Sequence, residues 1–182
     1  MASNSDKNMR AEGIAAAAAT AAKDGGLPPV HLWNPPFCGD LDMEIRADGS
    51  WFYEGTPIGR PAMVRLFSTI LKREGDRYFL VTPAEKVGIR VVDAPFLAVD
   101  ADISRDRVTF TTNVGDQVTA DADHPIIMRG NGVQPRPYVM VRAGLEALID
   151  RKTFYRLAAA ANEGPEGRIG LHSAGQFFAL ES

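Results

Sequence analysis

The side chains best suited to chemistry in this chain are arginines that open two helical segments. Arg60 and Arg65, and again Arg151 and Arg156, occupy a repeated Ile-x-Arg-x-x-Φ-Φ-Arg-Leu motif, where Φ is an apolar or aromatic residue. Positive charge near a helix N-terminus opposes the helix dipole, so these arginines need acidic partners. The partners are either internal carboxylates or an anionic ligand, and a guanidinium suits a phosphate because it offers a bidentate fork and keeps its charge when buried.

Other polar and aromatic residues extend this set into a candidate ligand site. Thr82, Glu85 and Lys86 form a polar insertion between two apolar strands, although a solvated hairpin tip is the simpler explanation. Arg142 ends an apolar strand, and aromatic rings are available to stack on a base. The Trp33 loop either lines a pocket or covers the open end of a sheet. The predicted ligand-binding residues are Trp33, Trp51, Arg60, Thr82, Glu85, Lys86, Arg142, Arg151 and Tyr155.

No motif for catalysis, metal binding or a cofactor is present. The sequence lacks a nucleophile elbow, a phosphate-binding glycine loop and a dinucleotide fingerprint. Seven aspartates between Asp93 and Asp123 face only two arginines, which suggests either a cation site or solvated turns, without any ligand-spacing motif. Cys38 is predicted to be a buried small hydrophobe rather than a reactive thiol. We therefore predict no catalytic residues, no metal and no cofactor.

Composition narrows the possible partners and the compartment. The net charge is −3 and the basic residues are scattered, which argues against nucleic acid as a partner. No apolar run is long enough to span a membrane. One cysteine excludes an internal disulfide and favours the cytoplasm. The Ala-rich N-terminal segment resembles a signal peptide only in outline, because alanine is weakly apolar and Glu12 interrupts it; a helix that either docks or frays is expected instead.

The remaining pattern predicts short strands and two helices. Asp48-Gly49 separates two strand-like runs and is a strong hairpin signal. Apolar residues at three- and four-residue steps predict a helix over approximately 60–73. Short apolar runs punctuated by Gly, Pro and Asn indicate a meander of strands. The predicted strands lie at 78–81, 87–92, 96–99, 108–111, 117–120, 126–128 and 138–141.

The two halves of the chain match each other when shifted by 91 residues. The shift aligns the two arginine motifs and gives six identities over 32 positions, about three times the chance level. The sequence therefore predicts an α+β fold made of duplicated antiparallel sheets, each covered by one helix. The expected divisions are an N-terminal helix and linker at 1–30, a first repeat at 31–98 and a second repeat at 99–182.

Several motifs together resemble a bacterial family, domain of unknown function 1285. The resemblance covers approximately residues 31–180. It rests on Trp33-Asn-Pro-Pro-Phe-Cys-Gly39, Asp48-Gly-Ser-Trp51, Pro57-Ile-Gly-Arg60, Leu66-Phe-Ser68, Tyr78-Phe-Leu-Val-Thr-Pro-Ala-Glu-Lys86, Val92-Asp-Ala-Pro-Phe96, Ala143-Gly-Leu-Glu-Ala-Leu-Ile-Asp-Arg151 and Phe154-Tyr155.

The resemblance implies a duplicated α+β core whose second half is similar to pleckstrin-homology-like folds. It also implies a nucleotide-like ligand between the halves and a role in signalling, with no catalytic residues to carry over. The leading hypothesis is a non-catalytic ligand-sensing protein that binds an anionic, nucleotide-like molecule between its two halves and acts in signal transduction. The alternatives are a small hydrolase or transferase using Asp, His124 and a Thr or Ser, and a protein-interaction module. The oligomeric state is not specified by the sequence.

Overall fold

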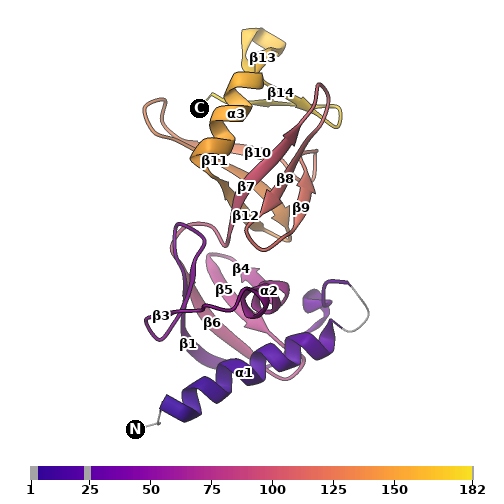
Figure 1. The fold of residues 1–182 in the computed structure, drawn as a ribbon. Helices are drawn as coiled ribbons and strands as arrows, with labels where there is room; N and C mark the ends of the chain where they lie inside the picture. The colour runs from indigo at the N-terminus through magenta and orange to yellow at the C-terminus, as the bar shows by residue number, and fades with distance from the viewer. Residues whose placement is uncertain (1–3, 23–25, 182) are drawn as a thin grey trace. The chain divides into compact units, whose positions relative to one another are not determined.

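The protein, seen in a computed structural model that describes residues 4–22 and 26–181, has two compact units (Figure 1). The first unit comprises the residues up to Arg46 together with Ser50–Val92. The second comprises Ala47–Gly49 together with the residues from Asp93 onward. Each unit contains its own six-stranded sheet, so the chain is α+β with a repeated sheet.

In the first unit, each α-helix precedes a group of three strands. Its elements are α1 (Asn4–Ala21), η1 (Val30–Leu32), β1 (Phe37–Ile45), β2 (Trp51–Tyr53), β3 (Thr56–Pro57), α2 (Pro61–Thr69), β4 (Leu71–Glu74), β5 (Arg77–Val81) and β6 (Lys86–Val91).

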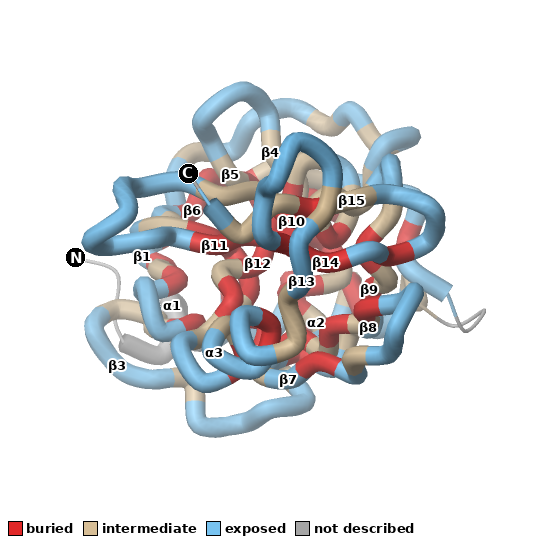
Figure 2. Tube along the Cα trace, turned by 90° about the horizontal axis from the view of Figure 1, so that it is seen from above, coloured by how far each residue is buried: buried red, intermediate tan, exposed pale blue. Residues whose placement is uncertain are grey.

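Two antiparallel meanders form the first sheet, in the order β3-β2-β1-β6-β5-β4. The predicted hairpin at Asp48-Gly49 is confirmed, with Ile45 opposite Trp51 and Gly49 at a φ of +82°. Only glycine adopts such a φ without a steric penalty, which explains the strength of the turn signal. Buried residues occur along the strands, whereas many of the connecting loops are exposed (Figure 2).

The predicted helix over 60–73 was too long, because it ends at Thr69 and a strand follows. The Ser68 and Thr69 hydroxyls donate hydrogen bonds to the carbonyls three residues earlier, at 2.6 Å each, and these bonds satisfy the last turn. Leu71 then pairs with Leu80 in β5. Ile70 and Leu71 are buried, and burial suits a helix and a strand equally, so apolar spacing alone did not distinguish the two.

Helix α1 docks on the first unit rather than fraying. Ala11, Ile14, Ala15 and Ala18 are buried and lie three or four residues apart, which places them on one face of the helix. The helix packs against α2, and the Arg10 guanidinium donates a hydrogen bond of 3.2 Å to the Cys38 carbonyl. Small side chains therefore allow α1 to approach the body closely. Among the described residues, no helix is long and apolar enough to cross a membrane.

The second unit contains a further six-stranded sheet and a separate three-stranded sheet. Its elements are β7 (Phe96–Ile103), β8 (Val108–Thr112), β9 (Gln117–Thr119), β10 (Ile126–Gly130), β11 (Pro135–Arg142), β12 (Leu145–Ile149), α3 (Arg151–Ala160), β13 (Asn162–Glu163), η2 (Pro165–Gly167), β14 (Ile169–Ser173) and β15 (Gln176–Ala179).

The duplication is visible in the order of the strands. The second large sheet has the order β10-β11-β12-β7-β8-β9, which is the arrangement of the first sheet with the first and sixth strands of the unit again at the centre. The 91-residue shift carries α2 onto α3 to within about one residue, but it carries β4, β5 and β6 onto β13, β14 and β15, whereas the sheet order relates these three strands to β10, β11 and β12. The 91-residue register is therefore not the register of the two duplicated sheets. The likeness of the second half to pleckstrin-homology-like folds stays a prediction.

The sheets are mixed, which corrects the expectation of purely antiparallel sheets. Strand β1 pairs with β6 in parallel, and β12 pairs with β7 in parallel. All other pairs in the three sheets are antiparallel, within the described part of the chain. A parallel pair joins strands that are far apart in sequence, so no local turn signal announces it.

A pair of neighbouring substitutions tests the docking of α1. We expect Ala18→Arg to lower the free energy of unfolding by about 1 to 3 kcal/mol, because the position is fully buried and cannot accept a charged side chain. Ala19→Arg, one residue along on the exposed side of the helix, serves as the control and should change stability by less than about 0.5 kcal/mol. Urea unfolding and hydrogen exchange over 9–22 measure both. Equal effects would contradict the docked helix.

Candidate functional site

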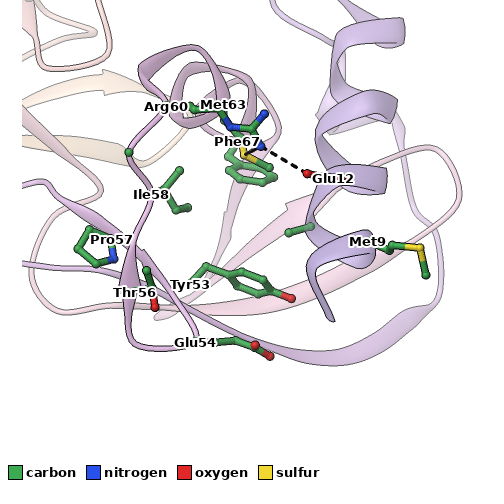
Figure 3. A pocket seen from close by; sticks show the side chains of 12 residues that line it. Met9, Glu12, Tyr53, Glu54, Thr56, Pro57, Ile58, Arg60, Met63 and Phe67 are labelled. Carbon is green, nitrogen blue, oxygen red and sulfur yellow. Dashed lines mark hydrogen bonds and ion pairs between the residues drawn. The ribbon is translucent and has the colours of Figure 1, made fainter. Parts of the chain in front are cut away.

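A cavity of about 760 Å³ lies within the first unit. This volume is within the range of small-molecule sites, roughly 300–1,000 Å³. Helix α1, the β2–β3 hairpin and the start of α2 form its walls, and it is open to solvent on one side (Figure 3). It is lined by Met9, Ala11, Glu12, Tyr53, Glu54, Thr56, Pro57, Ile58, Gly59, Arg60, Met63 and Phe67.

The hairpin wall of the cavity is built by a two-residue turn. Tyr53 pairs with Thr56 across it, and Glu54 and Gly55 both have positive φ values, of 51° and 78°. Two successive positive φ values are typical of a type I′ turn, whose twist matches that of the flanking strands. The turn places Glu54 at the edge of the cavity (Figure 3).

The opposite side of the cavity carries an ion pair between two helices. Arg60 is the residue before α2, and no side chain caps that helix end. Its guanidinium lies 3.5 Å from the Glu12 carboxylate on α1 (Figure 3), and donates a hydrogen bond of 3.3 Å to the Met63 sulfur. Both ion-paired side chains are mostly exposed, so the pair contributes at most about 1 kcal/mol.

Aromatic rings form the inner part of the cavity wall. Phe67 is fully buried and stacks on Trp51, with ring centroids 6.1 Å apart and planes 15° apart. Burial raises the pKa of the Tyr53 hydroxyl, and the neighbouring Glu54 carboxylate raises it further. Tyr53 therefore stays neutral at physiological pH. The cavity combines an apolar wall with one guanidinium, two carboxylates and a phenol.

Two family models match consecutive parts of the chain. The model for the N-terminal domain of a domain of unknown function, DUF1285, matches residues 28–94. The model for the C-terminal domain of the same family matches residues 95–180. The chain belongs to the DUF1285 family. Together the two matches leave α1 outside the family models.

Solved structures agree with this assignment. A DUF1285 family protein from Silicibacter pomeroyi DSS-3 is 58% identical to this chain, with 93% of this chain and 94% of that chain covered and a TM-score of 0.83. A DUF1285 family protein from Shewanella baltica OS155 is 29% identical, with 67% of this chain and 94% of that chain covered and a TM-score of 0.55. No curated protein matches the chain.

Of the nine predicted ligand-binding residues, only Arg60 lines the cavity. The others in the first unit lie in several separate places. Trp51 is buried behind Phe67, and Trp33 is half-buried after η1. The Thr82 hydroxyl accepts hydrogen bonds from the next turn, including one of 3.1 Å from the Glu85 backbone.

The other candidate cations differ in how completely they are paired. Lys86 contacts Glu74 at 3.0 Å and lies over the Phe79 ring. In the second unit, Arg142 is paired with Asp116 and lies over the Phe96 ring. Arg151 and Tyr155 are exposed on α3, whose N-cap Asp150 accepts a hydrogen bond from the backbone. The arginine motif therefore contributes Arg60 to a cavity and leaves Arg151 on an open helix surface.

Other sequence candidates have structural explanations. No group of three or more His, Cys, Asp or Glu side chains suitable for a metal ion occurs among the described residues. Cys38 is exposed, so the prediction that it is buried was wrong; it lies at the start of the β1 strand, where the alternating buried pattern has not yet begun. The His124 ring contacts Asp121 at 2.8 Å, and the same carboxylate oxygen accepts two backbone hydrogen bonds of the turn.

Sequence reasoning missed an ionic network on β10, β11 and β12. Arg129 makes a bidentate pair with the buried Glu146, at 2.6 and 2.8 Å. Arg136 pairs with Asp93 at 2.8 Å, and the Tyr138 hydroxyl donates to the same carboxylate. Burial and the Asp93 contact raise the pKa of Tyr138 to about 12. The residues come from four separate segments, so local spacing gave no signal.

The pKa of Tyr138 predicts a loss of stability at alkaline pH. A phenol with a raised pKa in the folded state contributes stability that is present below pH 10 and is lost as the pH rises toward about 12. We expect the stability of the wild type relative to Tyr138→Phe to fall over this interval, by up to about 1.4 kcal/mol for each pH unit. Urea unfolding from about pH 8 to about pH 11 measures the difference. Parallel curves for the two proteins would contradict it.

Proposed function

We propose that this chain is a non-catalytic ligand-sensing protein that binds an anionic, nucleotide-like small molecule in the cavity of its first unit. The observation that carries the proposal is the cavity itself, which has a suitable volume and one arginine at its edge. Tyr53, which is partly exposed, offers aromatic surface for a base. Arg60 offers a fork for one anionic group, in competition with Glu12.

The two carboxylates restrict the class of ligand. Glu12 and Glu54 both line the cavity beside one arginine, and they would repel a polyphosphate. A carboxylate accepts hydrogen bonds from the amino groups of a base or from sugar hydroxyls. These groups together favour a ligand with a single anionic group and several N–H or O–H donors, as in a nucleoside monophosphate. A role in signal transduction and a cytoplasmic location remain part of the proposal.

A hydrolase or transferase is the second candidate, because His124 and Asp121 are hydrogen bonded as a base and its orienting carboxylate would be. The His124 ring is hydrogen bonded to the Asp121 carboxylate at 2.8 Å. The carboxylate also closes its own turn, which is a sufficient structural role. Ligand binding is therefore the better-supported function.

Removing the cavity arginine tests the proposal directly. We expect Arg60→Ala to weaken binding of a nucleoside monophosphate about ten- to a hundredfold, because a hydrogen bond to a charged group contributes about 1.5–3 kcal/mol. Arg65→Ala is the matched control, because Arg65 is exposed on the same helix and does not line the cavity. Calorimetry measures affinity, and Trp51 fluorescence in a Trp33→Phe background reports on the ring stacked against Phe67.

The proposal fails if no member of a panel of nucleosides and nucleotides binds the wild type. It also fails if Arg60→Ala binds as tightly as Arg65→Ala does. Binding of uncharged nucleosides alone, unaffected by Arg60→Ala, would retain the cavity as a site but contradict the anionic ligand.

A second substitution predicts a gain rather than a loss. Glu12→Gln removes the carboxylate that competes for Arg60, so we expect an anionic ligand to bind up to about fivefold more tightly, the equivalent of an exposed ion pair. A cationic ligand would bind more weakly to the same variant. Calorimetry on the wild type and Glu12→Gln under one buffer condition therefore determines the sign of the ligand's charge.

A further inference from the structure

The second unit holds two arginines directly opposite each other on neighbouring strands. Arg129 on β10 and Arg136 on β11 are cross-strand partners in the antiparallel register. Their side chains therefore leave the same face of the sheet, with Cβ atoms about 4.5–5.5 Å apart. Like charges in such a pair are destabilising, so this arrangement requires compensation.

Two carboxylates that are more buried than the arginines provide the compensation. Glu146 is 10% exposed and Asp93 is 18% exposed, whereas Arg129 and Arg136 are 48% and 53% exposed. The carboxylates thus lie beneath the guanidinium groups, which face solvent. Tyr138 holds the arrangement together, because its ring lies 4.7 Å from the Arg129 guanidinium and its hydroxyl donates to both oxygens of Asp93.

Each guanidinium keeps hydrogen-bond donors after these contacts. A guanidinium has five N–H donors; Glu146 accepts two from Arg129, and the ion pair with Asp93 engages one terminal nitrogen of Arg136. The half-exposed side chains therefore present further N–H groups to solvent, with their orientation fixed from below. Binding an anion there costs little additional side-chain entropy.

On the first sheet, Glu44 is also more buried than its partners, at 27% exposed against 49% for Arg46 and 58% for Arg90. Two other ion pairs of that sheet lack the difference in burial. Arg90 and Asp42 are both 58% exposed, and Arg77 and Asp40 are 57% and 69% exposed. In those pairs the carboxylate is as accessible as the arginine and would repel an incoming anion. Arg129 and Arg136 differ from these pairs because they lie directly opposite each other and their two acidic partners are only 10% and 18% exposed.

We propose that Arg129 and Arg136 form a binding site for a phosphate monoester. A ligand with a single carboxylate would need only one guanidinium fork. A phosphate monoester carries nearly two negative charges and three terminal oxygens, so it can accept hydrogen bonds from two guanidinium groups at once. The site is separate from the cavity of the first unit, and the proposal does not depend on that cavity. Free phosphate, a nucleoside monophosphate and a phosphorylated peptide all carry the required group.

Nuclear magnetic resonance of the full chain tests the site. We expect inorganic phosphate to cause saturable shifts in the amide resonances of 127–138 at constant ionic strength. Arg136→Gln should weaken this binding at least about tenfold, while its partner Asp93 retains the Tyr138 hydrogen bonds. Arg168→Gln, an exposed arginine of the same unit, is the matched control and should leave binding unchanged.

Loss of Arg129 alone would leave the buried Glu146 unpaired, so the double variant Arg129→Gln with Glu146→Gln replaces the ion pair by an amide pair. Its folding is monitored by the same spectra, and it should also lose phosphate binding. The proposal is overturned if phosphate produces no saturable shift, if chloride produces the same shifts at equal ionic strength, or if Arg136→Gln binds as tightly as Arg168→Gln.

Three probes distinguish the source of the phosphate group. Inorganic phosphate, a nucleoside monophosphate and a phosphoserine peptide are titrated in parallel, and the tightest ligand that depends on Arg136 identifies the class. Arg60→Ala is included in each titration. Binding at this site must persist in Arg60→Ala, so failure of the cavity proposal and failure of this one are separable.

Discussion

The rest of this fold depends on one constraint, the parallel pairing at the centre of each six-stranded sheet. The two strands that pair there are the first and the last of that sheet in chain order. Strand β1 pairs with β6, and β7 pairs with β12. Both pairs join segments that are distant in sequence, so each has a substantial loop-closure cost. The other strands of each sheet attach to this centre through antiparallel pairing with a neighbour. The strands approach closely in the first of these pairs: a Cβ on Gly88 would lie 2.1 Å from a carboxylate oxygen of Asp40, so that exposed side chain would have to move.

The candidate sites occur on the hairpins that extend from these central pairs. In the first unit, β2 and β3 extend from β1 and carry the cavity residues Tyr53 and Glu54. In the second unit, β10 and β11 extend from β12 and carry Arg129 and Arg136. The long-range pairs supply rigidity at the centre of each sheet, whereas the hairpins offer exposed edges. The two units therefore use the same sheet order to present different chemistry, a partly apolar cavity in one and a surface of paired arginines in the other.

Local features of the sequence predicted much of the fold but little of the sites. Turn chemistry located the hairpin at Asp48-Gly49, and apolar spacing located the start of α2, because both signals depend on residues close in sequence. The end of α2 was missed because burial of Ile70 and Leu71 is compatible with a helix or with a strand. The cavity was missed because Glu12 becomes part of its wall only when α1 docks on the first unit, and the sequence left that docking open. The network around Tyr138 was missed because its members meet through tertiary pairing, which no local pattern reveals.

Amide hydrogen exchange under native conditions is the most direct measurement of the central constraint. We predict that hydrogen-bonded amides of β1 and β6, and of β7 and β12, exchange only through unfolding of their whole unit. Hydrogen-bonded amides in the hairpin β2–β3 and in β10 should exchange faster, through local opening that leaves the central pair intact. The central role of the parallel pairs would be contradicted if these hairpin amides exchange as slowly as those of the parallel pairs, or if the parallel pairs open first.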